Sequence, residues 1–268
     1  MLRMTRLGHD RYCDEIVHQT DRTRALLAGA DLTAKVPSCP EWTLGELVRH
    51  VGRAHRWAEA IVRTRADESV PEDQVPDFGG PADSEPAALE AWLADGAEKA
   101  AATLREAGAG TEVWSWAWER SAGFWARRMA HETVVHRADA ALAVSRTYEV
   151  EPDIGADTID EWLEIVAFSQ AHGDPEAADL RGGGRSILLR ARDAPRAVGA
   201  EWLIEFGEDR FDWRRGSTET PDATVELRGA LADVLLVFQR RLAPGSDRVE
   251  VLGDAKLLDF WLERTSFG

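Results

Sequence analysis

The hydrophobic pattern of this 268-residue chain changes near residue 150, and that change constrains the fold more than any other feature. Before it, apolar residues recur at helical spacing over long segments; after it, short apolar runs alternate with turn residues. The first half predicts four helices, which cover residues 9–27, 44–65, 84–107 and 123–144. Long helices joined by loops are typical of an antiparallel four-helix bundle.

The start of the second predicted helix carries the clearest local signal. Thr43 and Glu46 have the spacing of a capping box, and Trp42 and Leu47 occupy the positions of a hydrophobic staple. The residues before it, 36–42, are predicted to form a turn. Farther along, residues 67–83 are rich in Pro and Asp and predict a long loop. The alternating tryptophans of 114–118 are compatible with a short extended segment packed on the bundle.

The second half predicts a small α+β domain with a mostly antiparallel sheet. A polar stretch at 145–152 has the composition of a linker, which gives predicted domains of 1–147 and 153–268. Gly207–Asp209 suggests a hairpin between two of the strands. The predicted helices cover residues 158–169, 230–241 and a closing segment around Trp261, and the predicted strands cover residues 186–190, 201–206, 210–213, 223–227 and 249–251.

Charge and composition exclude several classes of partner. The formal net charge is −16, so approach to a nucleic acid or an anionic membrane would begin with repulsion. No uncharged apolar run approaches the roughly 18 residues of a membrane span, and the N-terminus lacks a signal-peptide core. Two cysteines cannot form a dense disulfide framework. We therefore expect a cytoplasmic protein, monomeric or weakly dimeric, that binds neither nucleic acid nor membrane.

One segment of the fourth helix carries residues suited to chemistry. Glu132 and His136 are four positions apart and project from the same helix face. His131 and His136 lie about 140° apart around a helix, so this is not the HExxH motif of zinc proteases. His50, on the apolar side of the second helix, is the candidate third ligand of a divalent metal. Spacing alone leaves open a core histidine at 50 and a surface pair at 132 and 136.

Residues 38–52 (SCPEWTLGELVRHVG) and 128–139 (RMAHETVVHRAD) together resemble the mycothiol-dependent maleylpyruvate isomerase family. That family belongs to the DinB-like four-helix metalloproteins. Residues 223–229 (ATVELRG) and 249–254 (VEVLGD) are similar to its C-terminal domain, which resembles sterol carrier proteins. The chain departs from the family pattern at Glu41, where glycine is usual, a change that we do not expect to affect the metal.

The resemblance implies a zinc site, or a site for another divalent metal, formed by His50, Glu132 and His136. Three protein ligands leave one coordination position open, as in catalytic zinc sites. The small-molecule thiol mycothiol would bind there as a thiolate nucleophile. It would isomerise or conjugate a small electrophilic substrate of the maleylpyruvate type, which makes the chain an isomerase or a thiol S-transferase.

Three further residues have roles in this interpretation. Arg240, and after it Arg241, would bind an anionic substrate, although both could be solvated residues at a helix end. Asp139 would orient a ligand imidazole, or would be a surface residue paired with Arg137 or Arg128.

Two other functions remain open on the sequence alone. One is a zinc-dependent hydrolase that needs no thiol. The other is a non-catalytic binding module with a vestigial metal site, whose C-terminal domain holds an apolar ligand.

Overall fold

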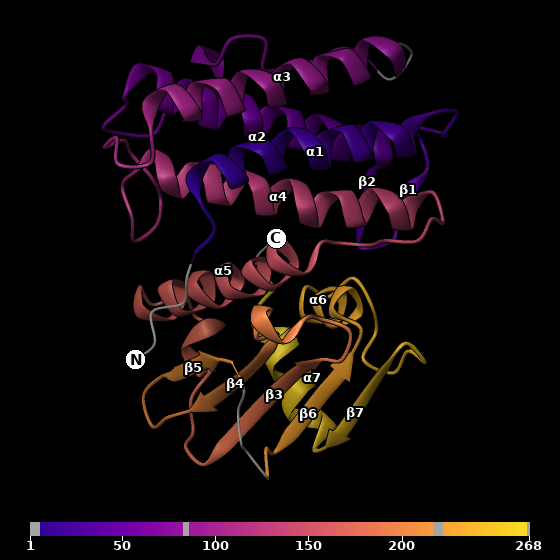
Figure 1. Cartoon of the computed structure of the whole chain (residues 1–268), viewed down its shortest axis with the longest axis vertical. Coiled ribbons are helices and arrows are strands. Elements are labelled where there is room, and N and C mark those ends of the chain that lie inside the picture. Colours follow the sequence, from indigo (N-terminus) through magenta and orange to yellow (C-terminus); the bar gives the residue numbers. More distant parts are fainter. Residues whose placement is uncertain (1–5, 83–85, 217–221, 267–268) are drawn as a thin grey trace. The chain divides into compact units, whose positions relative to one another are not determined.

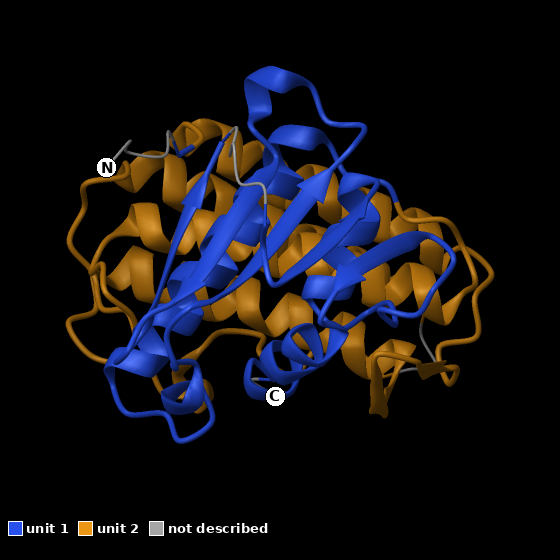
Figure 2. Ribbon diagram, turned by 90° about the horizontal axis from the view of Figure 1, so that it is seen from below, with its two compact units in different colours: residues 1–6, 149–268 blue, residues 7–148 orange. Residues whose placement is uncertain are grey.

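The computed structural model describes residues 6–82, 86–216 and 222–266. It divides the chain into two compact units (Figure 2). One unit comprises residues 7–148, and the other comprises residues 149–268 together with the N-terminal segment that includes Arg6. No helix in the described part of the chain is long and apolar enough to cross a membrane.

Four helices make up the 7–148 unit (Figure 1). α1 packs against α3 and α4, and α2 packs against the same two helices, so the predicted four-helix bundle is confirmed. The predicted start of the third helix at Ser84, and the predicted end of the preceding loop at Asp83, lie outside the described residues. The helices are α1 (His9–Leu27), α2 (Leu44–Thr64), α3 (Pro86–Ala107) and α4 (Ala122–Ala143).

The start of α2 is fixed by its cap. The Thr43 hydroxyl accepts a hydrogen bond from the Glu46 amide at 3.2 Å, and the Glu46 carboxylate accepts one from the Thr43 amide at 2.7 Å. These bonds satisfy amides that would otherwise have no partner in the first turn. The capping box predicted from the sequence is therefore confirmed, and it sets the rotation of the side chains that follow on α2.

A small hairpin precedes α2 where the sequence predicted only a turn. β1 (Lys35–Val36) pairs antiparallel with β2 (Cys39–Thr43), and Ser38 lies in the turn between them. A two-residue strand is too short to leave a periodic signal in the sequence. β1 packs against α4, and this contact holds the hairpin to the bundle.

The contact between α2 and α3 depends on two glycines. A Cβ atom added to Gly52 would lie 2.1 Å from the Trp92 ring, and one added to Gly96 would lie 2.2 Å from the Arg56 guanidinium. The Arg56 guanidinium itself lies 4.0 Å from the centre of the Trp92 ring. Small residues at these positions are what allow the two helices to approach this closely.

Replacing Gly52 with alanine should destabilise the helical unit. Overpacking costs about 1–3 kcal/mol or more, and the better helix propensity of alanine recovers only about 1 kcal/mol. We expect a net loss of about 2 kcal/mol, because Trp92 is buried and cannot move aside cheaply. Urea unfolding would measure this loss in the free energy of unfolding. Gly79→Ala is the matched control, because a Cβ there meets nothing within 4 Å, and an equal loss in both variants would contradict the packing argument.

The polar segment after α2 is a loop, as predicted, with one short 3₁₀ turn at Glu72–Gln74. Side chains from α2 and α3 donate to four of its backbone carbonyls. The donor–acceptor pairs are Trp57 to Val70, Trp92 to Asp77, Arg53 to Phe78 and Arg49 to Pro81. The loop is therefore anchored along its length.

The tryptophan-rich segment before α4 belongs to no named strand, and its rings pack on the bundle as the alternation suggested. Only an isolated bridge between Glu112 and Ser121 is formed in this part of the described chain. Trp114 instead packs edge-on against Trp57, and its carbonyl accepts a hydrogen bond from the Trp125 indole at 2.7 Å. Packing of aromatic rings against the bundle, rather than strand pairing, explains the alternation.

The C-terminal unit is a five-stranded sheet with three helices, in the order β5-β4-β3-β6-β7. Only β3 and β6 are parallel, so the prediction of a mostly antiparallel sheet is confirmed. The helix predicted from residue 158 begins earlier, because Pro152 occupies a first-turn position that suits proline. The elements are α5 (Pro152–Ala171), β3 (Arg185–Ala191), β4 (Glu201–Phe206), β5 (Phe211–Arg215), β6 (Val225–Gly229), α6 (Leu231–Phe238), β7 (Val249–Gly253) and α7 (Ala255–Arg264), with 3₁₀ turns at Ala177–Asp179 and Arg196–Val198.

Candidate metal centre

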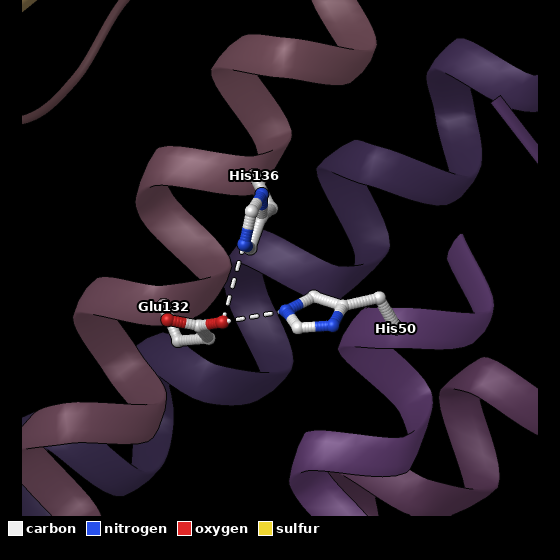
Figure 3. Close-up of side chains that lie close together, drawn as sticks. All are labelled: His50, Glu132 and His136. Atoms are coloured by element: carbon white, nitrogen blue, oxygen red, sulfur yellow. Dashed lines mark hydrogen bonds and ion pairs between the residues drawn. The ribbon is translucent and has the colours of Figure 1, made fainter. Parts of the chain in front are cut away.

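The three residues proposed as metal ligands meet between α2 and α4 (Figure 3). His50 comes from α2, whose register the capping box fixes, and Glu132 and His136 lie one turn apart on α4. The Glu132 Oε1 atom lies 2.9 Å from His50 Nε2 and 3.1 Å from His136 Nε2. All three potential ligand atoms lie within 4.8 Å of one another.

The cluster is partly open to solvent. The side chain of His50 is 39% exposed, that of Glu132 is 21% exposed and that of His136 is 11% exposed. A small molecule therefore has access from the His50 side, while His136 is held on the inner side. This graded exposure suits a site that binds a ligand from solution better than a closed structural site.

Charge within the cluster determines its protonation. Burial by itself favours the neutral acid, but His136, His50 and Arg128 hold the pKa of Glu132 well below its usual range. Burial likewise lowers the pKa of His136, but the Glu132 carboxylate and a hydrogen bond to Asp139 outweigh it and raise that pKa to about 9. At neutral pH a metal would have to displace a proton from His136.

The donor set fits a divalent metal such as zinc. Two imidazole nitrogens and one carboxylate oxygen are common zinc ligands, and bonds of about 2.0–2.2 Å place tetrahedral ligand atoms about 3.4 Å apart. The observed separations of 2.9 and 3.1 Å require the side chains to open by only a few tenths of an ångström.

Two neighbours contact the ligand residues. The Trp42 ring lies 4.7 Å from the His50 ring and 6.1 Å from the His136 ring, measured between ring centres. Arg128, one turn before Glu132 on α4, donates to Glu132 Oε2 at 3.0 Å. Its guanidinium therefore engages the carboxylate oxygen that does not face the histidines. The sequence analysis did not identify either contact, although Arg128 has the spacing for it.

The burial of Asp139 decides between the two roles that the sequence left open for it, orienting a ligand imidazole or lying on the surface. Asp139 is completely buried, so the alternative of a surface residue paired with a neighbouring arginine is wrong. Its Oδ2 atom lies 2.8 Å from His136 Nδ1, and its Oδ1 atom accepts a hydrogen bond from Ser38. The carboxylate thus contacts the imidazole at the nitrogen opposite the cluster. Sequence reasoning missed Ser38.

The other two histidines of these helices point away from the cluster, as expected from their spacing. His131 is buried edge-on against Tyr12, and His55 is buried with its Nε2 atom 2.8 Å from the Thr133 hydroxyl.

Arg240 belongs to the C-terminal unit and does not lie on a helix as predicted. α6 ends at Phe238, and the amides of Arg240 and Arg241 close the end by bonding to the carbonyls of Val237 and Leu236. This is a Schellman motif, and it places Arg240 in the left-handed region with φ of 61°. Glycine is usual at that position, so its absence removed the sequence signal for the helix end. The Arg240 side chain is exposed.

Replacing Arg240 with glycine separates a structural role from substrate binding. A left-handed residue with a side chain costs about 1 kcal/mol, so Arg240→Gly should stabilise α6 by about that amount. If Arg240 binds an anionic substrate, the same variant should lose activity while it gains stability. Melting temperature and kcat/KM would be compared with those of Arg241→Gly. Unchanged kcat/KM in Arg240→Gly would exclude the binding role.

Comparisons with known proteins agree with this architecture. Two crystal structures of a mycothiol-dependent maleylpyruvate isomerase share the fold, one of them a variant in which a histidine is replaced with alanine. Their TM-scores are 0.59 and 0.58 at 16% and 17% identity, and each match covers 92% of this chain and 95% of the other. No curated protein sequence gives a significant match.

Two family models cover most of the chain. The mycothiol maleylpyruvate isomerase N-terminal domain matches residues 13–141, and the MDMPI C-terminal domain matches residues 153–260. The chain therefore belongs to the mycothiol-dependent maleylpyruvate isomerase family, which is named for an enzyme.

Proposed function

We propose that this chain is a metal-dependent enzyme that uses mycothiol as its nucleophile to isomerise or conjugate a small electrophile of the maleylpyruvate type. His50, Glu132 and His136 would hold zinc or another divalent metal. The observation that carries the proposal is the convergence of their ligand atoms within 4.8 Å, in a chain of this family. The proposed protein is cytoplasmic, and it is a monomer or a weak homodimer.

When bound, zinc would lower the pKa of a thiol, so that the thiolate nucleophile forms near neutral pH. The residues of the chain prepare the site for that chemistry. Arg128 holds Glu132 Oε2, which leaves Oε1 directed toward the two histidines. The Trp42 ring packs beside both imidazoles.

In an isomerase, bound mycothiol would supply a thiolate for reversible addition to an activated cis double bond. Reversal of the addition after bond rotation would break the carbon–sulfur bond, give the trans alkene and regenerate the thiol. In a transferase the carbon–sulfur bond would remain, and the product would be a conjugate. Arg240 is our candidate for binding a substrate carboxylate.

Thiol dependence tests the proposal most directly. Turnover of a cis-alkene dicarboxylate should require added mycothiol, and cobalt-substituted protein should show a sulfur-to-metal charge-transfer band when mycothiol is added. The band should persist in a Cys13→Ser, Cys39→Ser variant. Burial raises the pKa of the Cys13 thiol to about 11, and neither cysteine belongs to the three-residue cluster.

Two outcomes would overturn the proposal. Turnover of ester or amide substrates without thiol, with no charge-transfer band, would favour a zinc hydrolase. Metal binding without turnover of any thiol and electrophile pair would favour a binding module with a vestigial site.

A further inference from the structure

Ser38 connects the β1–β2 hairpin to α4 across 101 positions of the sequence. Its hydroxyl donates to Asp139 Oδ1 at 2.5 Å, and the other oxygen of that carboxylate lies 2.8 Å from His136 Nδ1. Asp139 is completely buried. Burying a carboxylate is costly unless its oxygens accept hydrogen bonds, and Ser38 and His136 each contribute to meeting that cost.

The direction of these hydrogen bonds determines which nitrogen of His136 can bind a metal. A carboxylate accepts only, so His136 Nδ1 carries the proton that is donated to Asp139. The proton that a metal would displace is therefore the one on Nε2, the atom that faces Glu132 and His50, and Nδ1 would keep its proton. Ser38 bonds to Oδ1 and the imidazole to Oδ2, so the two contacts together orient the carboxylate.

We propose that Ser38 and Asp139 are positioning residues that make the β1–β2 hairpin a support of the metal centre. Asp139 fixes the tautomer and ring orientation of His136, and Ser38 fixes Asp139. This inference rests on the proposed metal site and adds to it the residues that set its affinity. Trp42, on β2 of the same hairpin, contacts the rings of both ligand histidines, so the hairpin contacts the centre at two points.

The isosteric variant Asp139→Asn tests the proposal without leaving a cavity. An asparagine can turn its amide nitrogen toward His136 and favour the wrong tautomer, so zinc affinity should fall about 10- to 100-fold. Ser38→Ala leaves the carboxylate in place and should cause a smaller loss of the same kind. Asp21→Asn, which removes a surface carboxylate on α1, is the matched control and should bind zinc as the wild type does.

Affinity would be measured by chelator competition, and the His136 tautomer by long-range ¹H–¹⁵N spectra of the zinc-loaded protein, assigned with His136→Gln. Circular dichroism and melting of the metal-free variants would confirm folding. Wild-type affinity and an unchanged His136 tautomer in Asp139→Asn would overturn the inference and leave the metal site standing. A wild-type protein that binds no divalent metal would overturn both.

Discussion

Replacement of His50 or His136 with alanine should remove nearly all zinc from the purified protein. Each change leaves two of three ligands, and loss of a ligand should weaken binding by more than about the hundredfold that loss of a supporting residue can cause. The geometry gives both residues the same role, because both Nε2 atoms face the same oxygen of Glu132. Elemental analysis after dialysis against a weak chelator would measure the retained metal.

His131 provides the control because it is adjacent to Glu132 in sequence but points away from it. His131→Ala should lose stability, since its ring is buried against Tyr12, but the folded fraction should keep one zinc per chain. Wild-type zinc content in His50→Ala would contradict the three-ligand site. Loss of metal from folded His131→Ala would show that the measurement reports general damage rather than ligation.

Acid should destabilise the helical unit through His55. Burial lowers the pKa of His55 from 6.5 to about 4, and the Thr133 hydroxyl, which donates to the Met129 carbonyl, accepts the Nε2 proton of His55. Protonation would therefore place a second proton on Nδ1, a buried atom with no hydrogen-bond partner among the described residues. Between pH 6.5 and 4 the unfolded chain binds this proton and the folded chain does not.

Neutral His55 makes its full contribution to the free energy of unfolding above pH 6.5. That contribution is lost as the pH falls through about 4. The difference in pKa corresponds to about 3 kcal/mol of unfolding free energy. In His55→Gln, the change in stability of metal-free protein between pH 7 and pH 4 should shrink by about that amount. Hydrogen exchange of α2 and α4 in urea would measure it.

His172→Gln is the control for this experiment. It removes an exposed histidine of the other unit, so the acid loss measured on α2 and α4 should match that of the wild type. If His55→Gln and the wild type lose equal stability in acid, the acid sensitivity arises elsewhere and the burial argument for His55 fails.

Local rules accounted for the parts of the site that lie on single helices. The capping box located the start of α2, and the spacing of Glu132 and His136 placed both on one face of α4. The meeting of these residues with His50 required the additional assumption that α2 and α4 are neighbours, which the expected bundle supplied. The family resemblance selected the same three residues.

The remaining features arise from contacts that no local pattern encodes. Ser38 meets Asp139 only because the hairpin packs on α4, and β1 is too short for a periodic signal. The predicted end of α6 was wrong because Arg240 adopts a left-handed conformation where the sequence offers no glycine. The first is a tertiary contact, and the second is a local helix end that lacks the residue by which such ends are usually identified.

The anchored loop after α2 has a consequence for how this chain can diverge among relatives. Its anchors recognise carbonyl oxygens of the main chain at Val70, Asp77, Phe78 and Pro81, and every residue type presents that oxygen. Substitution at exposed loop positions should therefore be nearly neutral in stability, whereas the donors Trp57 and Trp92 should be hard to replace. The loop is free to change its surface chemistry over evolutionary time without changing its path.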